Sequence, residues 1–206
     1  MISERWIRII LLILYIVGAV GMLMPSTRTS FVQLSALNLA ISFAGLIASR
    51  KTDRTTFLVF LSIAFVIGIT VELIGVHTSY LFGSYYYGNS LGWKWYGVPV
   101  IIGLNWGILT VTSAAVIHRL QFNKHIEAIL SAILMVVFDY ILEPVAIKLD
   151  YWQWTEGEIP VFNFICWMGV SYLLQWIYQR MRLAEVNKVA ESLFLMMFIF
   201  FTLLTF

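Results

Sequence analysis

Cysteine is almost missing from this chain: Cys166 is the single one among 206 residues, which excludes an internal disulfide and a cysteine metal cluster. Charged residues are scarce as well, at 12% of the chain. In contrast, 61% of the residues are hydrophobic and the mean hydropathy is +0.88. Such a composition leaves too little polar surface to cover a soluble globule. The sequence therefore predicts an integral membrane protein.

Seven apolar stretches reach or nearly reach the roughly 20 residues that cross a bilayer as a helix. They are Ile7 to Met24, Phe31 to Ala48, Phe57 to Ile74, Val98 to Ile117, Ile126 to Ile147, Val161 to Tyr178 and Val189 to Phe206. The first is too long for a signal-peptide core and no small-residue cleavage site follows it, so we expect it to be retained. The sequence predicts an all-α polytopic membrane bundle of about seven transmembrane helices, with residues 1–206 in one domain.

Lysine and arginine divide unevenly between the two sides of this topology. Ten lie at the N-terminus and in the second, fourth and sixth connections: Arg5, Arg8, Arg50, Lys51, Arg54, Arg119, Lys124, Arg180, Arg182 and Lys188. Three lie on the other side: Arg28, Lys94 and Lys148. Because basic residues favour the cytoplasmic side, we expect the N-terminus inside and the C-terminus outside. No nucleic-acid partner is expected, since these residues gather at helix ends and form no patch.

One pattern of residues occurs twice. A carboxylate is followed by aromatic residues thirteen and fifteen positions on, and then by a proline with a tryptophan seven residues after it. The two sets are Glu72, Tyr85, Tyr87, Pro99 and Trp106, and Asp139, Trp152, Trp154, Pro160 and Trp167. The pattern indicates a parallel internal repeat of about residues 56–119 and 125–179, which pairs the third and fourth spans with the fifth and sixth. Since charges in lipid are costly, a site between the repeats is expected.

The topology places the unusual residues at one depth. At about 1.5 Å per residue, Glu72 and Asp139 lie roughly 20 to 24 Å from the cytoplasmic ends of their helices, in the outer third of the membrane. Asn105 and Trp106 reach a similar level from the outer side. Glu143 follows Asp139 by one turn and shares its face. We expect these side chains to meet.

Two outer connections are too irregular to span and too apolar for free loops. Residues 75–97 combine five glycines with eight tyrosine, phenylalanine and tryptophan residues. We interpret them as a re-entrant or interfacial lid, since such segments are tolerated at membrane depth only against protein or a wet cavity. Residues 151–160 form the expected counterpart in the second repeat.

Some of these residues also have a purely structural interpretation. Trp93, Trp95 and Tyr96 suit an interfacial aromatic belt as well as they suit a site. Gly103 and Gly107 form a G-x-x-x-G step, which favours helix packing over chemistry.

The histidines and the acids of the fifth span leave alternatives open. His77 is favoured as a structural or interfacial residue over a metal ligand, because His118 and His125 fall on the cytoplasmic side and no histidine cluster forms. Asp139 and Glu143 could merely hydrogen-bond neighbouring helices. Because a third acid, Glu72, lies at the same depth, a functional site is favoured instead.

A pair of carboxyl groups in an apolar cavity can hold a proton for delivery. Faces of tyrosine and tryptophan stabilise cations without acting as nucleophiles, so they suit a carbocation intermediate. The membrane location implies an apolar substrate. Protonation of an isoprenoid double bond fits these three conditions.

The motifs around these residues resemble a known family over residues 68–170. The first half contains Glu72-x2-Gly75-x-His77-Thr78, Phe82-Gly83-x-Tyr85-x-Tyr87, Leu91-Gly92, Gly97-Val98-Pro99 and Asn105-Trp106. The second half contains Asp139-x2-Leu142-Glu143-Pro144, Tyr151-Trp152-x-Trp154 and Pro160-x2-Asn163-x3-Trp167. These motifs resemble the membrane carotenoid 1,2-hydratases, which are similar to the archaeal bisanhydrobacterioruberin hydratase. Ser79 departs from the family, where a glycine is usual.

The resemblance implies an enzyme of a prokaryotic cytoplasmic membrane that adds water to the terminal 1,2 double bond of an acyclic carotenoid, without metal or cofactor. Its partners would be the carotenoid, water and membrane lipid. We expect Asp139 and Glu143 to donate the proton, and Glu72 and Asn105 to position water. The residues expected to bind substrate are Tyr85, Tyr87, Trp106, Trp152, Trp154, Trp167, Asn163 and His77.

Two other functions stay open at this stage. A small membrane lycopene cyclase uses the same protonation, but those enzymes typically carry a Glu-Glu pair shortly after the proline, where this chain has Val100-Ile101-Ile102. A non-enzymatic proton-coupled transporter or lipid-binding protein could use the acids as a proton relay. Conversion of an acyclic carotenoid, and the mass of the product, would separate the three.

The charge distribution makes a direct prediction about topology. Single cysteines introduced at Thr52 and Asn89 should react with membrane-impermeant thiol reagents from opposite sides of the membrane, because basic residues retain the segment of Thr52 in the cytoplasm. Replacing Cys166 by serine gives the background for the experiment. Labelling of both positions from one side would contradict the topology.

Overall fold

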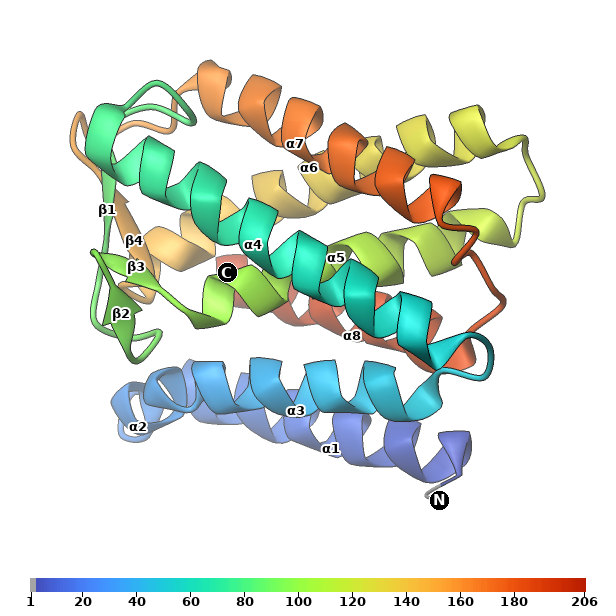
Figure 1. Cartoon of the computed structure of the whole chain (residues 1–206). Coiled ribbons are helices and arrows are strands. Elements are labelled where there is room, and N and C mark those ends of the chain that lie inside the picture. The colour runs from blue at the N-terminus through green and yellow to red at the C-terminus, as the bar shows by residue number, and fades with distance from the viewer. Residues whose placement is uncertain (1–2) are drawn as a thin grey trace.

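The structure, a computed structural model, describes residues 3–206 as a single helix bundle with short strands at one end (Figure 1). Its helices are α1 (Glu4–Leu23), α2 (Arg28–Gln33), α3 (Ser35–Ser49), α4 (Arg54–Thr78), α5 (Ile101–His118), α6 (Lys124–Lys148), α7 (Val161–Arg180) and α8 (Lys188–Thr205). Its strands are β1 (Tyr85–Tyr87), β2 (Lys94–Trp95), β3 (Val98–Pro99) and β4 (Trp152–Trp154). We call the end that carries the strands the strand end.

The expectation of an all-α membrane bundle is confirmed. Helices α1 and α4 to α8 are long and apolar enough to cross a membrane, while α3 has 15 residues and is shorter. The predicted spans agree with these helices to within about one turn, except for the second. There the helix is interrupted at Leu34, whose backbone N–H donates to the carbonyl oxygen of Phe31. Two helices, α2 and α3, therefore replace one continuous helix.

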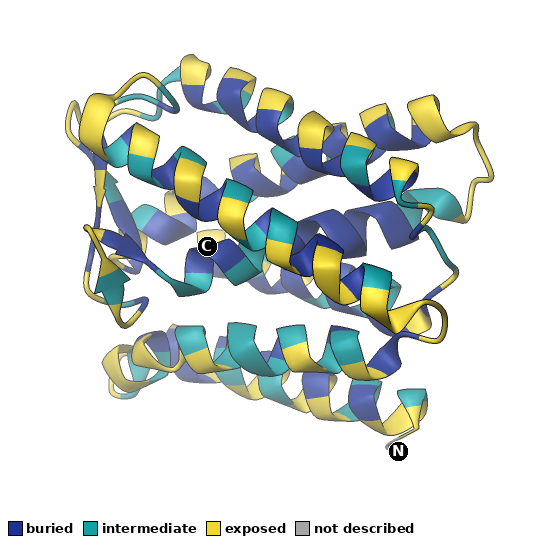
Figure 2. Ribbon diagram, in the orientation of Figure 1, coloured by how far each residue is buried: buried dark blue, intermediate teal, exposed yellow. Residues whose placement is uncertain are grey.

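Exposed residues lie on the outward faces of the helices and buried residues face inward (Figure 2). Large exposed hydrophobic residues occur on every side of the bundle, among them Trp6, Ile13, Val66, Ile165 and Leu195. An exposed apolar surface of this extent suits lipid and is unusual for a protein in water.

Helix α5 forms the core and packs against α3, α4, α6 and α8. Its G-x-x-x-G step faces α4: a Cβ atom at Gly103 would come within 2.6 Å of the Phe65 ring, and one at Gly107 within 3.3 Å of Leu61. The two glycines therefore let the helices approach closely, and the interpretation of this step as a packing motif is confirmed.

At the strand end, two antiparallel ribbons close the bundle. β1 pairs with β4, and β2 pairs with β3. The segment 75–97 that we expected to form a lid is divided: its start continues α4 to Thr78, and the rest makes β1, β2 and the turns between them. The strands themselves were not predicted from the sequence.

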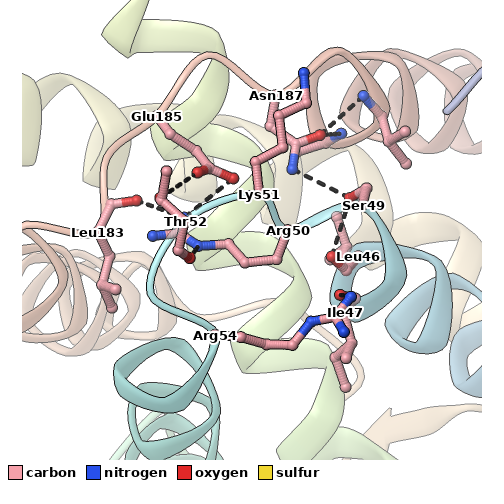
Figure 3. A network of polar contacts seen from close by, with 12 residues as sticks. Leu46, Ile47, Ser49, Arg50, Lys51, Thr52, Arg54, Leu183, Glu185 and Asn187 are labelled. Carbon is pink, nitrogen blue, oxygen red and sulfur yellow. Dashed lines mark hydrogen bonds and ion pairs between the residues drawn. The ribbon is translucent and has the colours of Figure 1, made fainter.

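At the opposite end, Arg50 joins the α3–α4 connection to the α7–α8 connection (Figure 3). Its buried guanidinium lies 3.3 Å from Glu185 and donates to the carbonyl oxygen of Leu183 at 2.7 Å. Asn187 donates to Ser49 at 3.1 Å beside it. Since a buried charge is stable only when it is paired and hydrogen-bonded, this cluster fixes the layer of α1 and α3 to the rest of the bundle.

Candidate active site

Glu72, near the strand end of α4, is buried and accepts three hydrogen bonds. The hydroxyl groups of Tyr85 and Tyr87 donate to its Oε2 at 2.6 and 2.7 Å, and the Trp106 indole donates to its Oε1 at 3.0 Å. Alternate residues of a strand face the same side, which is why Tyr85 and Tyr87 point inward while Tyr86 is exposed. The spacing in β1 thus supplies two donors to one carboxyl group.

Two glycines on α4 make room for these donors. Gly68 and Gly75 lie four residues before and three residues after Glu72, on the same face of the helix. A Cβ atom at Gly68 would lie 2.6 Å from the Trp106 ring, and one at Gly75 would lie 2.7 Å from the Tyr85 hydroxyl. Any larger residue would push a donor away from Glu72.

Glu143 on α6 is the second carboxyl group with three donors. Its Oε2 accepts from the indoles of Trp152 and Trp154 at 3.0 and 2.9 Å, and its Oε1 accepts from the Asn163 amide at 3.1 Å. The same amide donates to Asp139 Oδ2 at 2.9 Å. The other oxygen of Asp139, Oδ1, is buried and finds no hydrogen-bond partner among residues 3–206. Asn163 therefore links the two acids of α6.

The pairing of β1 with β4 places the two sets of donors face to face. Tyr85 lies opposite Trp154, and Tyr87 lies opposite Trp152, with ring centroids 5.3 and 6.0 Å apart. All four belong to the repeated sequence pattern, and the antiparallel pairing sets the first aromatic residue of one repeat opposite the second of the other. The strands thus bring the Glu72 and Glu143 carboxyl groups to one site.

Deeper in the bundle, Trp106 of α5 and Trp167 of α7 stack with their ring centroids 4.2 Å apart and their planes 23° apart. They also hold equal places in the repeated pattern. Phe82 lies beside Trp106 and has a left-handed backbone with φ of 67°. Because a non-glycine residue in this region costs about 1 to 3 kcal/mol, the fold holds Phe82 in place at the site against strain.

These side chains enclose a cavity of about 30 Å³, which we call the acid cavity. Its wall is formed by Glu72, Phe82, Tyr85, Tyr87, Ile102, Asn105, Trp106, Glu143, Trp152, Trp154, Asn163 and Trp167. All of the residues proposed from the sequence belong to it except two, Asp139 and His77. Phe82 and Ile102 were missed, although the Phe-Gly motif at residues 82 and 83 was a visible signal.

The two exceptions have different positions. Asp139 touches the wall of the cavity through Asn163, so it is placed to act on Glu143 more directly than on a bound molecule. His77 is exposed, and its Nε2 lies 2.9 Å from the carbonyl oxygen of Tyr96. The structure does not bring it to the acid cavity, and the structural interpretation of His77 fits its position.

A model of the carotenoid biosynthesis protein family matches residues 27–206. The chain belongs to this family. No curated protein and no solved structure matches it. The matched region contains every residue of the acid cavity. Membership implies a biosynthetic role on a carotenoid, an apolar substrate that suits a bundle with six long apolar helices.

No cation offsets the acids of this carotenoid biosynthesis protein within the described chain. Its ion pairs, such as Arg50 with Glu185, involve none of the three carboxyl groups. The neutral donors are therefore what stabilises charge at the site. Burial and the Glu72 carboxylate raise the pKa of the Tyr85 and Tyr87 hydroxyls well above the usual range, so both hydroxyls stay protonated and continue to donate.

The strand geometry predicts that removing the hydroxyl group destabilises the protein at Tyr87 but not at the neighbouring Tyr86. Tyr87→Phe removes a buried donor to Glu72, and we expect it to lower the free energy of unfolding by about 1.5 to 3 kcal/mol, the contribution of a hydrogen bond to a charged group. Tyr86→Phe, on the exposed face of the same strand, is the matched control and should change it by less than about 0.5 kcal/mol. Denaturation of the purified variants in detergent measures both. Equal effects would contradict the inward role of Tyr87.

Proposed function

We propose that this protein is a carotenoid 1,2-hydratase, which adds water to the terminal 1,2 double bond of an acyclic carotenoid. The observation that carries the proposal is the presence of two buried carboxyl groups, Glu72 and Glu143, on one small cavity walled by aromatic rings. A proton donor, a proton acceptor and cation-stabilising faces are then within reach of one bound double bond. Family membership supports the class of substrate.

Glu143 is the proton donor in this mechanism, because it lines the cavity and Asp139 does not. The π electrons of the double bond take the proton of Glu143 to form a C–H bond at carbon 2, and carbon 1 becomes a tertiary cation. The carboxylate that remains on Glu143 accepts from Trp152, Trp154 and Asn163, which stabilise its charge. Asp139 is a positioning residue that shares the Asn163 amide and keeps a second carboxyl group next to the donor.

Water completes the reaction. A water molecule held by Asn105 and Glu72 forms a C–O bond to carbon 1, and Glu72 accepts the proton that this water loses. Return of that proton to Glu143 through a further water restores the site, so each turnover consumes one water and no cofactor. Meanwhile aromatic rings of the cavity wall surround the cation, and each ring face turned toward it stabilises it by about 0.5 to 2 kcal/mol.

The size of the acid cavity favours capture by water over ring closure. At about 10 to 15 Å³ for each water, its volume of about 30 Å³ accommodates about two or three molecules. A cyclase must also fold the carotenoid so that a second double bond reaches carbon 1, which needs more room. Asn105, whose amide can donate to and accept from water, lines this cavity, whereas the positions where lycopene cyclases typically carry two glutamates hold Val100, Ile101 and Ile102.

Glu143→Gln tests the proton donor. The amide retains the shape of the side chain but has no acidic proton, so hydration should fall by about 100- to 10,000-fold. The matched control is Glu158→Gln, an exposed position in the β4–α7 connection, which should hydrate normally. The measurement is mass spectrometry of pigments from lycopene-producing cells, where the product gains the mass of one water per reacting end. Near-normal hydration by Glu143→Gln would exclude it as the donor.

Asn105→Leu tests the control of water. The two side chains have similar size, but leucine cannot hydrogen-bond a water molecule. Alcohol formation per folded protein should therefore fall by about tenfold or more, which corresponds to a rise of about 1.4 kcal/mol in the activation free energy. Part of the cation should instead lose a proton or close a ring. Alcohol, alkene and cyclic products are quantified against monodisperse protein. Undiminished alcohol would remove Asn105 from the site.

A further inference from the structure

A second and much larger cavity adjoins the acid cavity. Its volume is about 370 Å³, within the range of about 300 to 1,000 Å³ that is usual for sites of organic ligands. It lies between the layer of α1, α2 and α3 on one side and α5, α6 and α8 on the other. We call it the apolar cavity. Neither the sequence motifs nor the family match assigns it a role.

Three residues lie on the boundary of the two cavities. Ile102, Asn105 and Trp152 each line both of them. Trp152 is also a donor to Glu143, at 3.0 Å. A molecule that fills the apolar cavity and extends past these residues therefore ends beside the carboxyl group that we propose as the proton donor.

The wall of the apolar cavity suits a hydrocarbon. It is dominated by aromatic and aliphatic side chains, including Phe31, Leu39, Ile41, Phe138, Phe200 and Phe201. Hydroxyl groups on the wall are already hydrogen-bonded within the protein: Tyr15 to Ser42 at 3.3 Å, and Ser35 to Tyr151 at 2.6 Å. Such groups offer little to a polar ligand, which would lose its hydration on entering.

The cavity reaches the surface of the bundle on its apolar side. Val17 of α1, Leu34 between α2 and α3, and Leu37 of α3 line the cavity and are about half exposed. In a membrane bundle this surface faces the acyl chains of lipid. The apolar cavity is therefore accessible beside these three residues from the bilayer, where a carotenoid dissolves.

We propose that the apolar cavity holds the isoprenoid chain next to the reacting end of an acyclic carotenoid. The chain enters sideways between α1 and α3, places its terminal double bond at Asn105 and Trp152, and leaves the remainder of the molecule in the bilayer. An extended carotenoid is about as long as the bilayer is thick, roughly 30 Å, so its far half remains in lipid. The inference rests on the proposed function for what happens at the end of the chain, but binding can be measured without turnover.

Gly18 provides the test, because it lines the apolar cavity on α1 and a Cβ atom there would lie 3.4 Å from the Phe200 ring. Gly18→Phe should fill the cavity. Gly169→Phe makes the same substitution on the exposed face of α7, where a Cβ atom meets no described atom within 4 Å. Both variants are purified from lycopene-producing cells, and the total bound carotenoid, substrate and product together, is measured by absorbance per protein.

We expect Gly169→Phe to retain the carotenoid of the wild type and Gly18→Phe to lose it by roughly tenfold or more. Two further variants separate this from poor folding. Leu39→Trp narrows the cavity from α3 and should also lose carotenoid. Phe200→Ala added to Gly18→Phe gives back the space and should restore binding.

The outcomes separate the two proposals. Wild-type protein that binds lycopene without hydrating it, while Gly18→Phe binds none, would refute the hydratase and leave the cavity assignment standing. Hydration by the wild type with undiminished carotenoid in monodisperse Gly18→Phe and Leu39→Trp would overturn the cavity assignment alone. A wild-type protein that carries no carotenoid would also overturn it.

Discussion

Two carboxyl groups are buried at the strand end with no cationic partner among residues 3–206, and the fold around them supplies neutral donors. Glu72 and Glu143 each accept three hydrogen bonds. A hydrogen bond to a charged group contributes about 1.5 to 3 kcal/mol, whereas a buried charge left unpaired costs far more. The alternating side-chain directions of β1 and β4 point the donors inward, and the glycines of α4 make room for them. The strained backbone of Phe82 is held at the same site.

The two halves of the site are related but unequal. Trp106 and Trp167, which hold equal places in the sequence pattern, stack on each other, while across the strands the first aromatic residue of one repeat meets the second of the other. The acids do not follow the same rule, because Asp139 holds the place of Glu72 in the pattern while Glu143, one turn later, accepts the indole donors. The second half therefore has one more acid than the first. This inequality allows one carboxyl group to give a proton while the other accepts one.

Much of the architecture could be predicted from composition and periodicity. Apolar length defined the helices to within about one turn, since a bilayer requires about 20 apolar residues. The break at Leu34 could not be predicted, because it depends on a backbone turn and on Ser35 bonding to Tyr151, far away in the chain. The pairing of β1 with β4 could not be predicted either, because it too joins segments that are far apart in the chain. Short strands carry little local signal when their partner is a distant connection.

The site residues were easier to predict than their roles. Repeated spacing identified most of the acid cavity, since an acid inside a membrane helix needs partners and the partners recur at fixed distances. Spacing also favoured Asp139 over Glu143 as the equivalent of Glu72, and the family resemblance included His77, which lies at the surface. Which of these residues reaches the cavity depends on the direction in which its side chain points. The spacing of residues along the sequence does not give that direction.

In the mechanism proposed above, the division into two cavities separates the water from the hydrocarbon chain that carries the carbocation. Donors and acids occupy a space of about 30 Å³, and the hydrocarbon has about 370 Å³ of its own. Because Asn105 and Trp152 line both, the reacting double bond meets the polar side of the site only at its end, and the rest of the chain is kept from the acids. Water is then limited to the small polar space, where it is next to the acceptor Glu72. Under this proposal, Glu143 protonates only the terminal double bond, and the rest of the polyene stays away from the acids.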